Sequence, residues 1–286
     1  MKWQALFACL LTLAGFASSH AGETKSAPDM KVLRTPGGVR FGLFGDKGKA
    51  PAPTLFVFAV GLEDMKSHLY FTEVGRRLAK HGFLYVALDP PCHGEDVKPG
   101  EPPQLSGWAN RLRQGDKVIE TFTSRASAVL DHLVKEGYSD PEKVAACGVS
   151  RGGFLAFQFA AAEPRVKAAV GFAPVTNLLA LSEFKGMEKH EATKALALVN
   201  VAPKLAGRGI WISIGNHDER VSTDDAIAFS RKVVAASLAK QKGPTQAVPV
   251  EIQVGGSLGH ADLDGSHERA AAWLMQQLLG WAAPLK

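Results

Sequence analysis

The stretch "ACGVSRGGFLAF", residues 146–157, places a serine between two glycines, as Gly148-Val149-Ser150-Arg151-Gly152. The residues before this serine, "KVAACGV", form a short apolar run that is typical of a strand buried on both faces. The residues after it, "RGGFLAFQFAAA", are typical of a helix. We therefore predict a sharp strand–serine–helix turn, in which the missing β-carbons of Gly148 and Gly152 let the strand and the helix pack closely.

Strands and helices alternate on both sides of this turn. The predicted strands are 38–44, 54–61, 83–89, 143–149, 166–173, 209–215 and 248–255. The predicted helices are 66–81, 116–137, the segment directly after Ser150, 222–240 and 265–282, whereas residues 90–115, with five prolines and four glycines, are predicted to be irregular. This alternation predicts an α/β fold with a mostly parallel, doubly wound sheet.

Residues 174–208 interrupt the alternation and are too long for a plain connection. We predict that they form a small helical cap over the carboxyl ends of the strands, where open α/β sheets bind ligands. Apolar residues recur in this segment near helical spacing, among them Leu178, Leu179, Leu181, Phe184, Leu196 and Leu198. These side chains either line a substrate pocket or only pack the cap onto the sheet.

The composition is that of an ordinary globular protein. Of the 286 residues, 46% are hydrophobic and 21% are charged, so the chain can bury a sizeable core without disulfides or metals. We predict one main domain over residues 38–286. The 33 basic and 28 acidic residues form no long run of like charge, which gives no support to a role in nucleic-acid binding.

The first residues, "MKWQALFACLLTLAGFASSHAG", have the features of a secretory signal. Lys2 gives a positive start, residues 5–16 form an apolar run, and Ser19-His20-Ala21 offers small residues at both positions of a cleavage site. We predict a signal peptide over 1–21, a flexible lead-in over 22–37, and a periplasmic or secreted protein without membrane contact after cleavage. An N-terminal anchor helix is the alternative.

Two cysteines, Cys92 and Cys147, remain once the predicted signal peptide is removed. Cys147 lies in a predicted buried strand, which favours two free thiols, although an exported compartment would also permit a bridge. Neither cysteine belongs to a C-x-x-C pair, and the sequence has no H-E-x-x-H motif. We therefore expect that the protein needs neither a metal nor a cofactor.

A serine hydroxyl becomes an effective nucleophile when a base takes its proton and an acid orients that base. In "NHDERVS", Asp218 follows the predicted strand at 209–215, and in "GSLGHADLDG", His260 follows the one at 248–255. Parallel strands bring their carboxyl ends to one edge of a sheet, so Ser150, Asp218 and His260 are expected to meet there. Their chain order, serine then acid then histidine, is the order expected for this turn.

Other residues could take the same roles. Glu219 and Asp224 are alternative acids, but each lies further into the loop or helix, where solvent exposure or a first-turn position accounts for it. His217 directly precedes Asp218, so its side chain should point elsewhere. His93 follows another predicted strand, and we expect it to shape the floor of the site and not to act as the base.

Two backbone N–H groups are candidates for holding a developing oxyanion. The Arg151 amide lies at the N-terminus of the predicted helix, where N–H groups have no partner within the helix. The second donor should come from the loop after the strand at 54–61, where the amide of Leu62 follows Gly61. The alternative is that this loop only turns the chain.

From about residue 50 to residue 283 the chain resembles the α/β-hydrolase superfamily, and in particular small bacterial carboxylesterases of the dienelactone hydrolase and prolyl oligopeptidase branch. The resemblance rests on "GLEDMKSHLYFTEVGRRLAKHGFLYVALDPPCHGED", on "GVSRGGF" and on "GNHDERV" followed by "GH". Gly215, Asp218 and Val221 match the family's acid loop, which reads roughly G-x-x-D-x-x-V. One departure is Val60-Gly61, because such enzymes usually carry His-Gly at this place.

The resemblance implies an α/β-hydrolase fold and a serine hydrolase that cleaves a small-molecule carboxylic ester through an acyl-serine intermediate. If the predicted cap closes a small apolar pocket, short acyl chains should be preferred. Ser150 would be the nucleophile, although dienelactone hydrolases proper use a cysteine. His260 would be the base and Asp218 the acid, with the amides of Leu62 and Arg151 as the oxyanion hole. A peptidase or thioesterase with the same triad is one alternative, and a non-catalytic binding protein of hydrolase fold is another.

Overall fold

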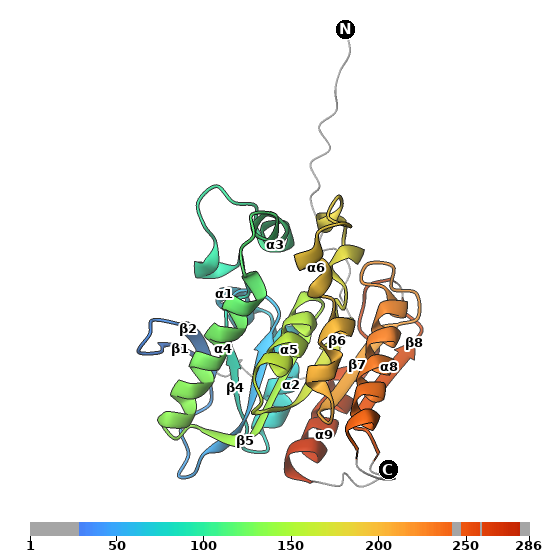
Figure 1. The fold of residues 1–286 in the computed structure, drawn as a ribbon. Coiled ribbons are helices and arrows are strands. Elements are labelled where there is room, and N and C mark those ends of the chain that lie inside the picture. The colour runs from blue at the N-terminus through green and yellow to red at the C-terminus, as the bar shows by residue number, and fades with distance from the viewer. Residues whose placement is uncertain (1–28, 242–246, 258, 281–286) are drawn as a thin grey trace.

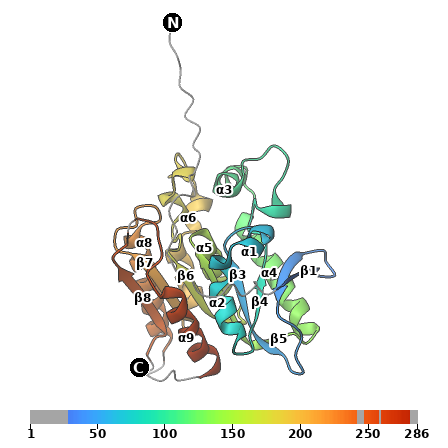
Figure 2. The same ribbon diagram turned by 180° about the vertical axis from the view of Figure 1, so that it is seen from behind.

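The computed structural model describes residues 29–241, 247–257 and 259–280. The predicted signal peptide at 1–21 and the first part of the predicted lead-in lie outside the described residues. One twisted sheet runs through the molecule with helices on both faces, as the two opposite views in Figure 1 and Figure 2 show.

In the described part of the chain, eight strands pair in the order β1-β2-β4-β3-β5-β6-β7-β8. Strands β1 and β2 pair antiparallel with their neighbours, and all pairs from β4 to β8 are parallel. The strands are β1 (Met30–Arg34), β2 (Arg40–Phe44), β3 (Ala52–Phe58), β4 (Leu84–Ala87), β5 (Ser139–Val149), β6 (Val166–Phe172), β7 (Gly209–Gly215) and β8 (Val250–Gly255). The prediction of a mostly parallel, doubly wound sheet is confirmed.

Helices cover both faces of this sheet. Figure 1 shows α4, α5 and α8 on one face, and Figure 2 shows α1, α2 and α9 on the other. The longer helices are α1 (Leu62–Ser67), α2 (Leu69–Ala79), α3 (Gln104–Arg113), α4 (Val118–Lys135), α5 (Arg151–Ala162), α8 (Thr223–Lys240) and α9 (Ser266–Leu279). These helices contribute apolar side chains to two cores, one on each face of the sheet.

Strand β3 illustrates how the sequence creates these two cores. Leu55 and Val57 point into the core beside α2 and α9, whereas Phe56 and Phe58 point into the core beside α4 and α5. Successive side chains of a strand point to opposite faces, so an uninterrupted apolar run is what a strand buried on both faces requires. The rings of Phe56 and Phe159 on α5 lie 5.1 Å apart, which anchors α5 directly over this strand.

Three local predictions differ from the structure. The lead-in predicted over 22–37 contains strand β1 at Met30–Arg34, an edge strand whose mostly exposed side chains give no apolar signal. The helix predicted over 66–81 is two helices, α1 and α2, which are separated by His68 in an extended conformation. The region predicted to be irregular contains α3, which begins directly after Pro103, where proline costs no hydrogen bond.

The segment 174–208 lies over the carboxyl ends of the strands, beside α3, and consists of short helices (Figure 1). They are η2 (Leu178–Ala180), η3 (Ser182–Phe184), α6 (Glu191–Ala195), α7 (Leu198–Val201) and η4 (Ala202–Leu205). Leu178, Leu181, Phe184 and Leu198 are all at most 2% exposed and join the core on the α5 face. These four side chains therefore hold the segment against the body of the protein.

Within the described residues, none of the helices combines the length and the apolar character needed to cross a membrane.

Candidate active site

Ser150 lies at the sharp turn between β5 and α5. Its backbone has φ 54° and ψ −116°, a conformation that is costly for a residue with a side chain. Two backbone hydrogen bonds offset this cost. Ser150 N–H donates to the carbonyl of Phe172 at 2.8 Å, and the Ser150 carbonyl accepts from Val175 N–H at 3.0 Å. The turn therefore holds the serine side chain at the carboxyl end of the sheet.

Two glycines make this turn possible. A β-carbon at Gly148 would lie 2.2 Å from the carbonyl carbon of Gly152, and one at Gly152 would lie 1.8 Å from the carbonyl oxygen of Phe58. Both distances are far inside van der Waals contact, so α5 can approach β3 and β5 only where these side chains are absent. This requirement explains why the serine is flanked by glycine on both sides.

The structure brings Ser150, His260 and Asp218 together from three separate loops. His260 Nε2 lies 3.0 Å from Ser150 Oγ, and His260 Nδ1 lies 2.8 Å from Asp218 Oδ2. An ionised carboxylate can only accept, so Nδ1 carries the hydrogen and Nε2 is left to accept from the serine hydroxyl. This is the arrangement in which a histidine can take a proton from serine.

The Asp218 side chain is completely buried, and the backbone around it satisfies its charge. Its Oδ1 accepts from the N–H groups of Arg220 at 3.0 Å and Val221 at 3.2 Å, while Oδ2 contacts His260. The hydroxyl of Thr223 accepts from Asp218 N–H and donates to the carbonyl of Gly215, which fixes the loop to the end of β7. These contacts point one carboxylate oxygen at the imidazole.

The residues considered as alternatives for the acid and the base have other surroundings. His217 and Glu219 are 77% and 82% exposed and pair with each other at 3.2 Å. Asp224 is exposed in the first turn of α8. His93 is buried, and its Nδ1 bonds the carbonyl of Pro91 at 2.8 Å. Burial and the neighbouring charge of Arg151 lower the pKa of His93 to about 4, so it is neutral at physiological pH.

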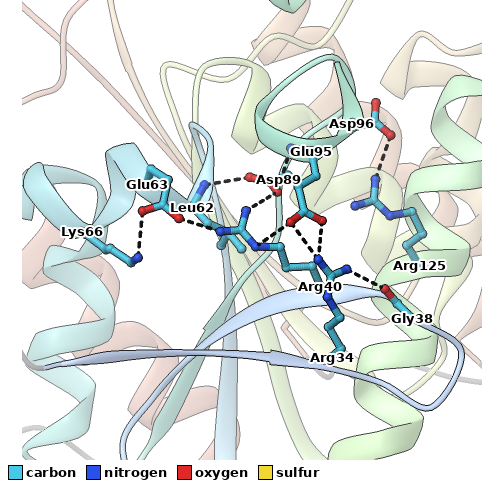
Figure 3. Close-up of polar contacts among 10 residues, drawn as sticks. All are labelled: Arg34, Gly38, Arg40, Leu62, Glu63, Lys66, Asp89, Glu95, Asp96 and Arg125. Carbon is cyan, nitrogen blue, oxygen red and sulfur yellow. Dashed lines mark hydrogen bonds and ion pairs between the residues drawn. The ribbon is translucent and has the colours of Figure 1, made fainter. Parts of the chain in front are cut away.

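The Leu62 amide, predicted as an oxyanion donor, has another partner in the structure. Its N–H donates to Asp89 Oδ1 at 2.8 Å, and the Asp89 side chain is 1% exposed (Figure 3). The amide is therefore committed to a buried carboxylate. Arg151, in contrast, is the first residue of α5, where its N–H has no partner within the helix.

Sequence reasoning missed Asp89, which ties three elements together. Its carboxylate also accepts from Arg40 of β2 at 3.2 Å and from the N–H of Glu95 at 3.4 Å (Figure 3). A β-carbon at Gly94 would lie 2.3 Å from Asp89 Oδ1, so the loop after β4 wraps tightly around it. The available signal was an acidic residue at the end of a buried apolar strand, where a charge needs partners.

A second missed cluster supports the loop that carries His260. Asp262, two residues further on, accepts from the Tyr70 hydroxyl and pairs with His267 Nε2 at 2.9 Å. His267 Nδ1 lies 3.3 Å from Glu73 Oε2. Burial opposes the charge on His267, but the hydrogen bonds with Asp262 and Glu73 outweigh it and raise the pKa of His267 to about 9. The His260 loop is thus clamped to α2 and α9 by a buried ion pair.

Cys92 and Cys147, the cysteines within the described residues, are buried and free. Burial raises the pKa of Cys92 to about 12 and also raises that of Cys147, so both are thiols at neutral pH. Among the residues that the structure describes, no three His, Cys, Asp or Glu side chains are grouped in a way that could hold a metal ion.

The sheet order, the serine turn and the contacts among Ser150, His260 and Asp218 define a protein of the α/β-hydrolase fold. The profile of the Dienelactone hydrolase family matches residues 42–241, well over half of the chain. The chain therefore belongs to the dienelactone hydrolase family, which identifies it as a hydrolase. No curated protein matches the sequence.

Solved structures with a similar fold include esterases and peptidases. A cold-adapted esterase from an Arctic intertidal metagenomic library has a TM-score of 0.58 and 16% identity, over 87% of this chain and 92% of its own. Acetyl xylan esterase 1 from Thermoanaerobacterium sp. JW/SL YS485 has a TM-score of 0.61 and 15% identity, over 88% of each chain. Dipeptidyl peptidase 4 from Porphyromonas gingivalis has a TM-score of 0.63 and 16% identity, over 87% of this chain but 35% of its own, so this chain spans about a third of it. At these identities the similarity establishes the fold.

Replacement of Gly152 by alanine should destabilise the protein, because the new β-carbon would lie 1.8 Å from the Phe58 carbonyl oxygen. We expect a loss of at least about 2 kcal/mol in the free energy of unfolding, measured by urea denaturation. Gly37→Ala is the matched control, since the nearest atom to its new β-carbon would be 3.9 Å away. Equal stability of the two variants would disprove the close approach of α5 to β3.

The His267 ion pair predicts that stability falls at high pH. Its pKa is raised from 6.5 to about 9, so its contribution is fully present below about pH 6.5 and is lost as pH rises through 9. This contribution is on the order of 3 kcal/mol. Urea denaturation between pH 6 and pH 10 should show a decline in the wild type that is absent in His267→Gln. The exposed control His217→Gln should follow the wild type, and a wild type that follows His267→Gln would contradict the prediction.

Proposed function

We propose that this protein is a serine hydrolase that cleaves carboxylic esters through an acyl-serine intermediate. The observation that carries the proposal is the continuous contact from Ser150 Oγ to His260 Nε2 and from His260 Nδ1 to Asp218. Three different features position these residues. A strained turn holds the serine, a clamped loop holds the histidine, and backbone N–H groups hold the acid.

In the acylation step, Ser150 Oγ forms a bond to the ester carbonyl carbon and its proton passes to His260 Nε2. The π electrons of the carbonyl move onto its oxygen, which becomes the oxyanion beside the Arg151 amide. Asp218 stabilises the imidazolium and keeps its Nδ1–H fixed. When the carbonyl re-forms, the bond to the alcohol oxygen breaks, and that oxygen takes the proton from His260.

Deacylation repeats the sequence with water. The water oxygen forms a bond to the acyl carbon while His260 Nε2 takes a proton from it. As the second tetrahedral intermediate collapses, the bond to Ser150 Oγ breaks and the serine takes this proton back. The carboxylic acid leaves, and each of the chain's groups has returned to its starting state.

The choice of an ester is supported by two of the three structural neighbours described above, which are esterases. A peptidase acting through the same three residues is the second candidate, because a dipeptidyl peptidase is also among the neighbours. Rates on matched ester, thioester and amide substrates separate these activities, since the amide has the poorest leaving group. The signal-like residues 1–21 favour action in the periplasm or outside the cell.

We further propose that the segment 174–208 limits the length of the acyl chain. Glu183 of this segment forms a two-point ion pair with Arg220, at 2.6 and 2.9 Å, two residues beyond Asp218. The adjacent Phe184 and Leu181 are buried against the body of the protein. A segment fixed at both its apolar face and its charged face has little freedom to open for a long acyl chain.

Ser150→Ala should remove turnover while the protein stays folded. We expect kcat on p-nitrophenyl acetate to fall on the order of 10⁶-fold, because the nucleophile is lost. A fluorophosphonate probe should label the wild type and leave Ser150→Ala unlabelled. Ester hydrolysis within tenfold of wild type in this variant would overturn the proposed nucleophile, and an unlabelled wild type would favour a non-catalytic binding protein.

Phe184→Leu should shift the preference for acyl length toward longer chains. The smaller side chain loosens the packing that holds the segment 174–208 against the body of the protein, so that a longer acyl chain can enter. Since one methylene in a confined apolar site is worth roughly 1–3 kcal/mol, the ratio of kcat/KM for hexanoyl and butyryl esters should rise at least tenfold. Phe229→Leu, on α8, is the matched control, because Phe184 and Phe229 are both completely buried. The same ratio in wild type and both variants would show that the segment does not set the chain length.

A further inference from the structure

An oxyanion needs more than one hydrogen-bond donor, and the second donor has still to be identified in this structure. The Arg151 amide can serve as the first donor, but the Leu62 amide bonds Asp89 Oδ1 at 2.8 Å and points into the protein (Figure 3). Asp89 is wholly buried and is itself held by Arg40. Freeing the Leu62 amide would leave a buried carboxylate short of a donor, which costs about 1–3 kcal/mol or more.

The Arg151 side chain reaches the end of β3, where the missing donor is required. Its Nε donates to the carbonyl oxygen of Ala59, the first residue after β3, at 3.2 Å. Its charge interacts with His93 after β4 and with Asp64 of α1. It also interacts with Glu183 of the segment 174–208 and with Arg220 of the acid loop. The guanidinium is therefore surrounded by the loops that frame Ser150.

Arg151 differs from other arginines of the described chain in the kind of partner that its guanidinium bonds. Among the described residues, Arg40, Arg111 and Arg165 each pair with two or more carboxylates. Arg151 has instead the single bond to a neutral carbonyl, and burial lowers its pKa, although an arginine stays protonated. The charges of Glu183 and Asp64 act on Arg151 through space, but within the described residues both Glu183 oxygens bond Arg220 and the one hydrogen bond of the Arg151 guanidinium goes to Ala59.

We propose that the guanidinium of Arg151 is the second donor to the oxyanion, in the place that the sequence assigns to the Leu62 amide. The inference rests on the proposed function, since it concerns the tetrahedral intermediate formed at Ser150. One residue then supplies both a backbone N–H and a charged side chain to the same oxygen. Nε anchors the side chain to Ala59, and the terminal N–H groups remain for the oxyanion, where a preformed charge is most effective.

The test compares Arg151→Gln with Arg208→Gln on p-nitrophenyl acetate. Arg208 is the matched control, because it is also partly buried, bonds a single main-chain carbonyl at 3.1 Å and has a pKa lowered by burial, but it precedes β7 at the opposite edge of the sheet. We expect kcat to fall by about 10²–10³-fold in Arg151→Gln with little change in KM. Arg208→Gln should stay within about twofold of wild type, since it contacts nothing at the site.

Chemical rescue distinguishes a donor from a structural support. Guanidinium chloride at millimolar, non-denaturing concentrations should restore part of the kcat of Arg151→Ala in a saturable way, and sodium chloride at equal ionic strength should not. A loss of kcat that guanidinium does not restore would overturn the inference. It would also be overturned if Arg151→Gln kept kcat within threefold of wild type, because a backbone amide such as that of Val60 would then suffice.

The same experiment separates this inference from the proposed function. A wild type that is labelled by fluorophosphonate and hydrolyses the ester, together with an unaffected Arg151→Gln, would refute the role of the guanidinium alone. A wild type that is neither labelled nor active on ester, thioester or amide substrates would refute both the serine hydrolase and the donor.

Discussion

The close contact between α5 and β3 is the constraint on which the site depends. At Gly152 the helix lies so near the Phe58 carbonyl that a β-carbon would be 1.8 Å from the oxygen. This approach forces Ser150 into its strained conformation and sets the start of α5 over the ends of the central strands. Because of it, the Arg151 side chain can reach Ala59 and the serine hydroxyl can reach His260.

The central strands and the three contacting residues could be predicted from the sequence because topology alone brings them together. Strands β5, β7 and β8 are parallel, and each is followed by a loop at the same edge of the sheet. Ser150, Asp218 and His260 each lie within a few residues of such an end, so their meeting follows from the apolar runs that define the strands. No knowledge of side-chain geometry was needed for that inference.

Details that depend on which polar groups pair in three dimensions could not be predicted in this way. The partner of the Leu62 amide is Asp89, 27 residues further along the chain, and no local pattern links the two. The clamp formed by Glu73 and His267 joins positions 194 residues apart. In both cases a buried charge is costly unless it is paired, so it pairs with whichever polar group the fold brings near. The periodicity of apolar residues in the sequence does not indicate which group that is.

The charged side chains of the site acquire their partners at different stages of the reaction. Asp218 is satisfied before any substrate binds, by two backbone N–H groups and by His260. Glu183 is likewise paired with Arg220. Arg151 has a neutral carbonyl as its described partner, so its interaction with an anion is still to be made. An interaction that forms when the carbonyl oxygen becomes an oxyanion stabilises the transition state more than the bound ester, which is the condition for a contact to raise kcat.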